Sequence, residues 1–432
     1  MSVRQANSPP EIGRTVQIRF LRRDRKGADP RYTICKTTKL CDQRGGISPV
    51  KRFCSILNQL LQVFPRTEFQ KAVKETGAER GAKGFSSWNH FVAMLFCQLG
   101  NAQSLREIEG GLASCQGRLE QLGAGAVSRS TLWYANEKRP WQLLEKIFYQ
   151  TYERCRGEAG NKTKFRFKQR LLSIDSTHVS LCAEMFGWAK YSRQKGAVKL
   201  HFTLDHAGYL PAAMVITTGA HSELSVARAQ KYEAGTILVM DRGFVHIPWF
   251  SQLNRNGVSF VTRMKKYIVY ETIERRIAHG VVADEMIHLT SAQSRKIYPE
   301  TLRLVTIETP DGEPLQFLTN EMRLAASTIA NIYKDRWQIE AFFKMLKQNL
   351  RIKSFVGTSA NAVWTQIWTA LIAMLLLKYL QLKARFGWSF SNLVYFLRMN
   401  LFVYRDLWDW LHHPFIQQPP ANTPRQTSLA WT

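Results

Sequence analysis

The sequence predicts an α/β protein in which a β-rich region lies between two helical regions. Between Val50 and about Tyr149, apolar residues recur every three or four positions, as in amphipathic helices. From Arg170 the pattern changes to the alternation of strands, and a helical pattern resumes near Ala325 and continues to about Tyr404. A chain of 432 residues is long enough for two or three domains with a sizeable core.

The segment 1–48 is basic and shows no periodicity. It is either a basic arm or an extension without function, and both interpretations stay open. Its first residues contain no apolar run, so no signal peptide is expected.

The helical region 49–155 carries recognisable start and stop signals. Pro65 ends a first helix, Ser86 opens a second, the capping-box sequence SLRE (104–107) opens a third, and Ser128 opens a fourth. Two short helices around a Gly-containing link suggest a helix-turn-helix unit.

In such a unit, Arg129, Ser130 and Thr131 lie at a helix N-terminus, where hydroxyl and backbone N–H groups suit DNA phosphates. The alternative is an ordinary helical domain in which the serines only cap helices.

The region 165–355 contains the predicted strands. LLSIDSTHVSLC, AVKLHFTLD and YLPAAMVITTG predict a three-strand antiparallel meander, with the turn HAG between the last two. TILVMDRGF predicts a buried strand that runs into Asp241, and VSFVTRM predicts another. Helices are expected over SELSVARAQKYEAG and IPWFSQLNRNG. Short β-like segments follow at about 267–325, two of them joined by the hairpin sequence PDGEP.

Helices are predicted again for 356–410, and a flexible tail rich in Pro, Gln and Thr for 411–432. The most apolar stretch, 362–380, is interrupted by Gln366 and follows a basic segment. We therefore expect a buried core helix rather than a membrane span, and no membrane partner.

The charge balance indicates a polyanionic partner. Lys and Arg number 60 against 33 Asp and Glu, which gives a net charge of +27, far beyond what solubility requires. Nucleic acid is the simplest such partner, and a ribosome-associated protein is the plainer alternative. The 7 cysteines are scattered without any CxxC pair. This argues against a disulfide framework and a zinc site and favours reduced thiols in the cytoplasm.

Three acids are placed unusually. Asp175 lies inside an apolar strand, Asp241 ends another, and Glu340 lies on the helix predicted for IYKDRWQIEAFFKMLKQNL (332–350). Each has a plainer alternative: a turn for the two aspartates, and a solvated salt-bridge helix for the glutamate. At about 100° per residue, however, Glu340 falls beside the apolar stripe of its helix rather than opposite it.

The motifs IDST, MDRG and Tyr333-x2-Arg336-x3-Glu340-x6-Lys347, in this order, resemble the DDE transposases of bacterial insertion sequences. The last motif is similar to the Y-(2)-R-(3)-E-(6)-K signature of the insertion-sequence-four family. FSSWNHFVAMLFCQL, SLREIEGGL, GAVKLH and FVGTSANAVWTQIW also resemble that family, so the likeness covers roughly residues 50–380.

The chain departs from the family in two places. Residues 1–48 have no counterpart. In GAHSELS (219–225), Ser222 and Glu223 follow His221, whereas the family often has Asp directly after His, which puts any role for this loop in doubt.

The resemblance implies an RNase H-like catalytic domain, with the first Asp on the first strand and the second on the fourth. It further implies a β insertion at about 267–325, a helical DNA-binding domain before the catalytic domain and a helical C-terminal region after it.

The resemblance also implies that Asp175, Asp241 and Glu340 are catalytic and bind two divalent ions. Three converging carboxylates repel one another unless a cation lies between them. Oxygen ligands favour Mg²⁺, with Mn²⁺ able to substitute. Asp175 would bridge both ions, Asp241 would bind one and Glu340 the other.

Around these acids, Arg336 and Lys347 are expected to bind phosphates beside the scissile bond, and Tyr333 to support the DNA end. Lys344 has a similar direction, but a plain surface residue is the stronger interpretation for it. Lys199 and His201, on the second strand, either approach the DNA backbone or are structural.

The implied function is cut-and-paste DNA transposition: metal-dependent cleavage of double-stranded DNA at terminal inverted repeats, then strand transfer into target DNA. A homodimer in the DNA complex and a cytoplasmic, nucleoid-associated location are expected with it. The alternatives are an RNase H-like nuclease that cuts without joining, and an inactive or domesticated derivative that binds DNA as a regulator. Binding alone does not need three converging acids, which argues against the last.

Overall fold

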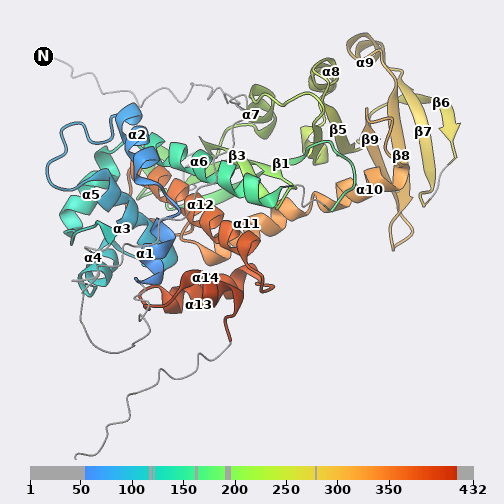
Figure 1. Ribbon diagram of the computed structural model, residues 1–432. Helices are drawn as coiled ribbons and strands as arrows, with labels where there is room; N and C mark the ends of the chain where they lie inside the picture. The colour runs from blue at the N-terminus through green and yellow to red at the C-terminus, as the bar shows by residue number, and fades with distance from the viewer. Residues whose placement is uncertain are drawn as a thin grey trace, which may run out of the picture.

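The computed structural model describes residues 54–115, 119, 122–160, 164–189, 196–277 and 280–415. The basic segment 1–48 and residues 416–432 of the predicted tail lie outside this part of the chain. Within it, a long sheet runs through the molecule, and most of the helices gather around one of its ends (Figure 1).

The N-terminal helical region consists, in the described residues, of α1 (Ile56–Leu61), α2 (Arg66–Thr76), α3 (Ser87–Leu99), α4 (Leu105–Ala113), α5 (Arg129–Lys138) and α6 (Gln142–Ala159). The predicted starts are confirmed, because the hydroxyls of Ser86, Ser104 and Ser128 accept backbone N–H groups in the first turns of α3, α4 and α5. The side chain of Glu107 accepts the backbone N–H of Gln103, the residue before the N-cap, so the return bond of the predicted capping box is shifted by one residue.

The strands form one sheet in the order β3-β2-β1-β4-β5-β9-β8-β7-β6. Their bounds are β1 (Leu171–Leu181), β2 (Gly196–Asp205), β3 (Leu210–Thr218), β4 (Ile237–Met240), β5 (Ser259–Arg263), β6 (Tyr270–Arg276), β7 (Ala283–Leu289), β8 (Leu302–Glu308) and β9 (Pro314–Thr319). β1, β2 and β3 form the predicted antiparallel meander, and β4 and β5 continue the sheet in parallel with β1. The first Asp is therefore on the first strand, and the second follows the fourth, as expected.

The predicted β-rich insertion extends this same sheet. β9 pairs antiparallel with β5, and β8, β7 and β6 continue outward from it. The sequence PDGEP joins β8 to β9 as a hairpin, as predicted. A helix that we did not predict, α9 (Ala292–Ile297), lies between β7 and β8. It buries none of its residues, so no apolar periodicity marks it in the sequence.

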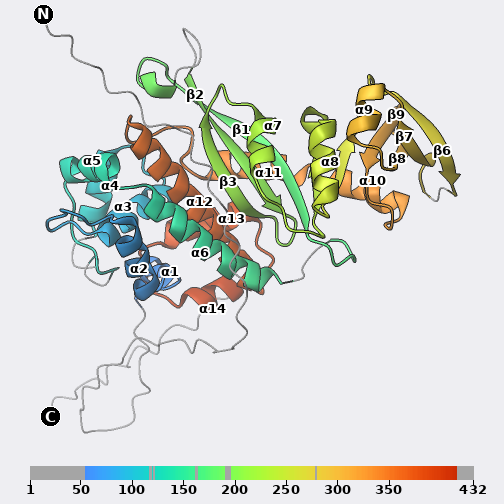
Figure 2. The ribbon, with the colours of Figure 1, turned by 90° about the horizontal axis from the view of Figure 1, so that it is seen from above.

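Helices cover both faces of the sheet (Figure 2). The remaining helices are α7 (Glu223–Ala229), α8 (Ile247–Arg255), α10 (Ala326–Asp335), α11 (Gln338–Asn349), α12 (Ala360–Lys383), α13 (Phe390–Asn400) and α14 (Leu407–His412). α10 packs on the face that carries Leu171, and α7 and α8 pack on the face that carries Leu172. Because successive side chains of a strand point to opposite faces, Asp175 lies on the face of Leu171.

α12 is the central helix of the core. It contacts α3, α5, α6 and α13, so the helices before and after the sheet share one hydrophobic core. In the described part of the chain it is the one helix long and apolar enough to cross a membrane, yet 83% of its most apolar segment is buried inside the protein. The predicted core helix is thereby confirmed. Leu411 is fully buried in α14, so the core reaches just past the predicted start of the tail.

The prediction of a single helix over 332–350 is wrong in one respect, because the helix is divided at Arg336 and Trp337 into α10 and α11. Both residues keep right-handed helical dihedral angles, but the backbone N–H of Glu340 bonds to the carbonyl of Trp337, three residues back. The turn is tighter than an α-helix there. It places Arg336 at the end of α10 and Glu340 in the first turn of α11.

Candidate active site

Asp175 is a partly buried acid of β1. Its Oδ1 accepts the backbone N–H of Ser176 at 2.8 Å. Burial raises the pKa of the carboxyl to about 6; the hydrogen bond from Ser176 and the charge of Arg336 oppose this rise, and the charges of Glu340 and Glu223 add to it. A cation that binds beside this buried carboxyl would stabilise its ionised form.

Asp241 lies next to Asp175 because β1 and β4 are parallel neighbours. Ile174 pairs with Met240, so each aspartate is the next residue along its strand. The hydroxyl of Tyr333 donates to Oδ1 of Asp241 at 3.4 Å. The two acids therefore lie side by side where β4 ends, which is the kind of position where sites form in α/β sheets.

Arg336 lies between Glu340 and Asp175. Its Nη1 donates to Oε1 of Glu340 at 2.9 Å and lies 3.8 Å from Oδ2 of Asp175. The other oxygen of Glu340, Oε2, is buried and has no hydrogen-bond partner among the described residues. The structure thus brings the helix-borne acid to the first strand-borne acid through one shared guanidinium group.

A tight cluster of the three carboxylates is not formed. Within the ranges that the structure describes, no three His, Cys, Asp or Glu side chains lie close enough together to hold one metal ion. The guanidinium of Arg336 lies between Asp175 and Glu340 and offsets the repulsion between these two carboxylates. The donors nevertheless suit a hard cation, because all are carboxylate oxygens and Oε2 of Glu340 lacks a partner among the described residues.

The two lysines of α11 have different surroundings. Nζ of Lys347 donates to Oγ1 of Thr177 at 2.6 Å, and burial lowers its pKa. Thr177 belongs to the same IDST motif as Asp175, so this contact holds Lys347 beside the acids. Lys344 is exposed, which agrees with its interpretation as a surface residue.

On β2, Lys199 and His201 are buried and bonded to neighbouring backbone and side chains. Nζ of Lys199 donates to the carbonyl of His221 at 3.1 Å, and Nε2 of His201 lies 2.9 Å from Oγ1 of Thr217. Burial lowers the pKa of His201 to about 4, so its ring is neutral at pH 7 and brings no positive charge to a phosphate. These contacts support the structural alternative for His201.

Glu223 also reaches the site, although its loop departs from the family pattern. Its Oε1 accepts the hydroxyl of Ser176 at 2.6 Å and lies 3.5 Å from Nζ of Lys199. Sequence reasoning gave Glu223 no role. One signal could have found it: an acid at the first position of a helix that directly follows a strand of the meander.

In the helical region, Arg129, Ser130 and Thr131 are exposed in the first turn of α5. Oγ of Ser128, the N-cap residue, lies 3.1 Å from Oγ of Ser130 and 2.8 Å from Oγ1 of Thr131. The predicted placement of these three residues at a helix N-terminus is therefore confirmed.

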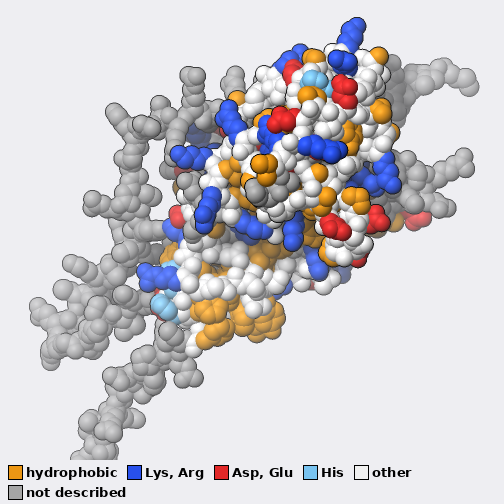
Figure 3. Space-filling view, turned by 90° about the vertical axis from the view of Figure 1, so that its right-hand side faces the viewer, with side chains coloured by type: hydrophobic (Ala, Val, Ile, Leu, Met, Phe, Trp, Pro, Cys, Tyr) orange, Lys and Arg blue, Asp and Glu red, His pale blue; other side chains and the backbone are white. Residues whose placement is uncertain are grey.

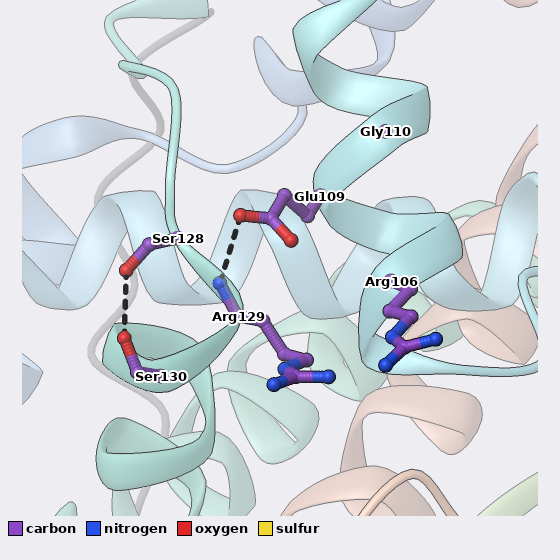
Figure 4. A pocket seen from close by; sticks show the side chains of 6 residues that line it. All are labelled: Arg106, Glu109, Gly110, Ser128, Arg129 and Ser130. Carbon is purple, nitrogen blue, oxygen red and sulfur yellow. Dashed lines mark hydrogen bonds between the residues drawn. The ribbon is translucent and has the colours of Figure 1, made fainter.

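A hollow of about 620 Å³ opens between α4 and this first turn of α5 (Figure 4). The backbone N–H of Arg129 donates to Glu109 across it at 3.1 Å. The guanidinium groups of Arg106 and Arg129 lie on the same side of the hollow (Figure 4). Arg106 was missed in the sequence, because nothing in SLRE shows that its Arg faces another helix.

Comparisons with known proteins agree with the motifs. Residues 166–376, which include all three acids, match the transposase DDE domain, and residues 54–125 match a domain of unknown function. The cryo-EM structure of the piggyBac transposase synaptic complex with hairpin DNA is similar with a TM-score of 0.43 and 12% identity, over 82% of this chain and 80% of that one.

Three curated relatives come from bacteria. A protein of Sinorhizobium fredii named as a transposase is 31% identical over 71% of this chain and 86% of its own length. One of Geobacillus stearothermophilus, named for insertion sequence element IS5377, is 29% identical over 58% and 67%. The transposase for insertion sequence element IS4 of Escherichia coli is 26% identical over 43% and 44%. The chain therefore belongs to the IS4 family of bacterial DDE transposases, enzymes that act on DNA and carry out DNA transposition.

Proposed function

We propose that this transposase cuts double-stranded DNA at the terminal inverted repeats of its own insertion sequence and joins the ends to target DNA, in a cut-and-paste reaction. Asp175, Asp241 and Glu340 are the catalytic acids. The observation that carries this proposal is the position of Arg336, which contacts both Asp175 and Glu340 beside the strand that ends at Asp241. Asp175 and Glu340 share this guanidinium although they lie far apart in the sequence, and Asp241 follows the strand next to β1. Burial raises the pKa of Asp175, which is typical of functional sites.

A DDE domain uses divalent metal ions. We infer two Mg²⁺ ions, with Mn²⁺ able to substitute, because the donors are oxygen atoms alone. Asp175 would bind both ions, Asp241 one and Glu340 the other. When bound, such ions lower the pKa of an attacking water or DNA 3′-hydroxyl and neutralise charge at the phosphate. The unpartnered Oε2 of Glu340, in the described part of the chain, supports this ligand set.

The protein's own cations position the DNA. Arg336 bonds to Glu340 through Nη1 alone, and its buried Nε has no acceptor among the described residues, so Glu340 does not use up its hydrogen-bonding capacity. Its guanidinium would bind a phosphate beside the scissile bond. Lys347 lies at the IDST motif, and a phosphate beside it would raise the pKa that burial lowers. Tyr333, whose hydroxyl reaches Asp241, would support the DNA end.

We assign end recognition to the helical region before the sheet. The first turn of α5 offers hydroxyls and backbone N–H groups, and Arg106 and Arg129 add positive charge at the same hollow. The exposed side chains of Trp133 (51%) and Tyr134 (60%) follow on the same helix and extend the contact surface. This arrangement favours a DNA-binding role for α5 over mere helix capping.

A homodimer fits the reaction. An insertion sequence has two ends, whereas each chain carries one set of three acids, so joining both ends in one event requires two chains. Lys and Arg side chains are spread over the end of the molecule shown in Figure 3, with fewer Asp and Glu among them. Together with the net charge of +27, this surface suits extended contact with DNA at the bacterial nucleoid, in the cytoplasm.

A labelled DNA end tests this proposal. The DNA that flanks the gene supplies the terminal repeats, and the same DNA with scrambled repeats is the control. With Mg²⁺ and a target plasmid, the purified protein should release the element and join its labelled 3′ ends to the plasmid. Cleavage without any joined product would instead identify a nuclease, and binding without cleavage would identify an inactive regulator.

A further inference from the structure

A buried chain of hydrogen bonds connects β1 to the junction between α10 and α11. Oγ of Ser173 lies 2.6 Å from Nε2 of His206, and Nδ1 of His206 lies 2.7 Å from Oδ2 of Asp335. The three residues are 0%, 3% and 3% exposed, respectively. Three polar groups with this little exposure need a reason to be inside the fold, because each loses its contact with water.

The protonation of this chain follows from its partners. Asp335 also accepts the hydroxyl of Tyr209 at 3.2 Å and pairs with Nζ of Lys164 at 3.2 Å. Burial opposes ionisation, but the contacts with His206 and Lys164 outweigh it and lower the pKa of Asp335. The ionised carboxylate can only accept, so Nδ1–H of His206 donates to it, and Nε2 of the same ring is hydrogen-bonded to the hydroxyl of Ser173.

The order Ser–His–Asp also occurs in serine hydrolases, but the surroundings here exclude that chemistry. A nucleophilic serine needs a hydroxyl that faces a substrate. Ser173 is at 0% exposure in a central strand of the sheet, so no substrate reaches its hydroxyl. The three hydrogen-bonded residues therefore have a role within the fold, not in a reaction with a substrate.

The two ends of this chain lie next to the catalytic acids. Ser173 is two residues before Asp175 on β1 and shares its face of the sheet. Asp335 is the last residue of α10 and is followed directly by Arg336, with Glu340 in the first turn of α11. The link therefore spans from the strand of the first acid to the junction that carries the third.

His206, the middle residue of these hydrogen bonds, is anchored to β1 through its backbone. The backbone N–H of His206 donates to the carbonyl of Leu171 on β1 at 3.1 Å. The imidazole therefore projects from a turn that is itself bonded to the strand of Asp175. Through it, the end of α10 is held at a set distance from that strand.

We propose that Ser173, His206 and Asp335 are positioning residues, which set the place of Arg336 and Glu340 relative to Asp175. This inference rests on the proposed catalytic function of the acids. A misplacement of about 1 Å at a reacting centre can cost on the order of 100-fold in rate. Partners that orient metal-binding side chains typically contribute about 10–100-fold in metal affinity or activity.

Three variants disrupt this chain of hydrogen bonds to different extents. Asp335→Asn and His206→Ala should lower the rate of end cleavage by about 10–100-fold and raise the Mg²⁺ concentration needed for half of the maximal rate. Ser173→Ala removes one hydroxyl and should give a smaller change of the same kind. The affinity for terminal-repeat DNA without metal should stay within about twofold for all three, because the helical DNA-binding surface is untouched.

Tyr209→Phe is the matched control. It removes one donor to Asp335 outside the chain and keeps the aromatic ring, so cleavage and Mg²⁺ dependence should be unchanged. A readout besides activity is the rise in melting temperature on addition of Mg²⁺, which reports ion binding by mass action. This rise should shrink in Asp335→Asn and His206→Ala and persist in Tyr209→Phe.

The inference is overturned if folded Asp335→Asn and His206→Ala proteins keep the cleavage rate, the Mg²⁺ dependence and the Mg²⁺-induced stabilisation of the parent. If both fail to fold, Ser173→Ala decides by the same three measurements. Glu340→Gln, measured in parallel, distinguishes a failure of the catalytic assignment from a failure of the positioning role. If Glu340→Gln still cleaves, the catalytic assignment fails; if it is inactive while Asp335→Asn is fully active, the positioning role alone fails.

Discussion

At the residue scale, the buried carboxyl of Asp175 lowers the stability of the fold when it is ionised. Burial raises the pKa of its carboxyl to about 6, above the usual range of an aspartate. The folded protein thus binds this proton more tightly than the unfolded chain does. For such a group, the stabilising contribution is complete below the unfolded pKa and is lost as the pH rises through about 6. At pH 8, without a bound cation, the ionised Asp175 therefore destabilises the fold.

Asp175→Asn should accordingly stabilise the protein at pH 8 without divalent ions, because it removes a buried charge. We expect the melting temperature to rise by roughly 2 °C. At pH 5 the gain should shrink, since Asp175 of the parent is then largely protonated. Calorimetry at both pH values checks this, and a lower melting temperature of the variant at pH 8 would contradict the assigned pKa.

The same carboxyl links metal use to pH. A cation must displace the proton of Asp175 before it can bind, so metal affinity should fall as the pH drops through about 6. Below this value, the Mg²⁺ concentration for half of the maximal cleavage rate should increase by about tenfold per pH unit. Titrations of cleavage with Mg²⁺ between pH 5 and pH 8 measure it. A requirement that does not change with pH would show that Asp175 is not a ligand.

At the scale of elements, α11 offers a matched pair of lysines one turn apart. Lys347 binds Thr177 beside the acids, whereas Lys344 is exposed. If Lys347 stabilises charge at the scissile phosphate, Lys347→Ala should lower strand transfer by about 10–100-fold. Lys344→Ala removes the same charge from the same helix and should change it by less than about threefold. Equal losses in the two variants would mean that helix charge matters and position does not.

The N-terminus of α5 carries the prediction for end recognition. Arg129→Ala should weaken binding to terminal-repeat DNA and reduce the slope of log affinity against log salt by about 1, as for one lost phosphate contact. The control is Arg156→Ala, which removes an equal charge from α6, where Arg156 lies near Glu153. Filter binding between low and moderate salt measures both. An unchanged slope for Arg129→Ala would show that Arg129 makes no phosphate contact and would contradict a DNA site at the start of α5.

Most elements were predictable because their signals are local. Serine caps mark the starts of α3, α4 and α5, and runs rich in apolar and β-branched residues, with the turn HAG between the last two, mark the meander. The break between α10 and α11 gave no such signal. It lies at Arg336 and Trp337, which keep helical dihedral angles, and Asp335 just before it is bound to His206, a partner far away in the sequence.

At the scale of the whole molecule, the helices on both sides of the sheet share the core around α12. The α5 surface and the three acids therefore belong to one packed body, and variants of either need testing in the full chain. Three motifs in order, and their resemblance to the family, indicated the three acids and the cations around them. They could not indicate Glu223 at Ser176 or the chain from Ser173 to Asp335, because those contacts exist only after distant segments have packed.

The most direct measurement is strand transfer by the purified full chain with Mg²⁺, a labelled DNA end carrying the element's own repeat, and a target plasmid. We predict that Asp175→Ala, Asp241→Ala and Glu340→Ala each abolish the joined product while binding of the labelled end largely survives. A joined product that persists in all three variants would contradict the assignment of these acids as the active site.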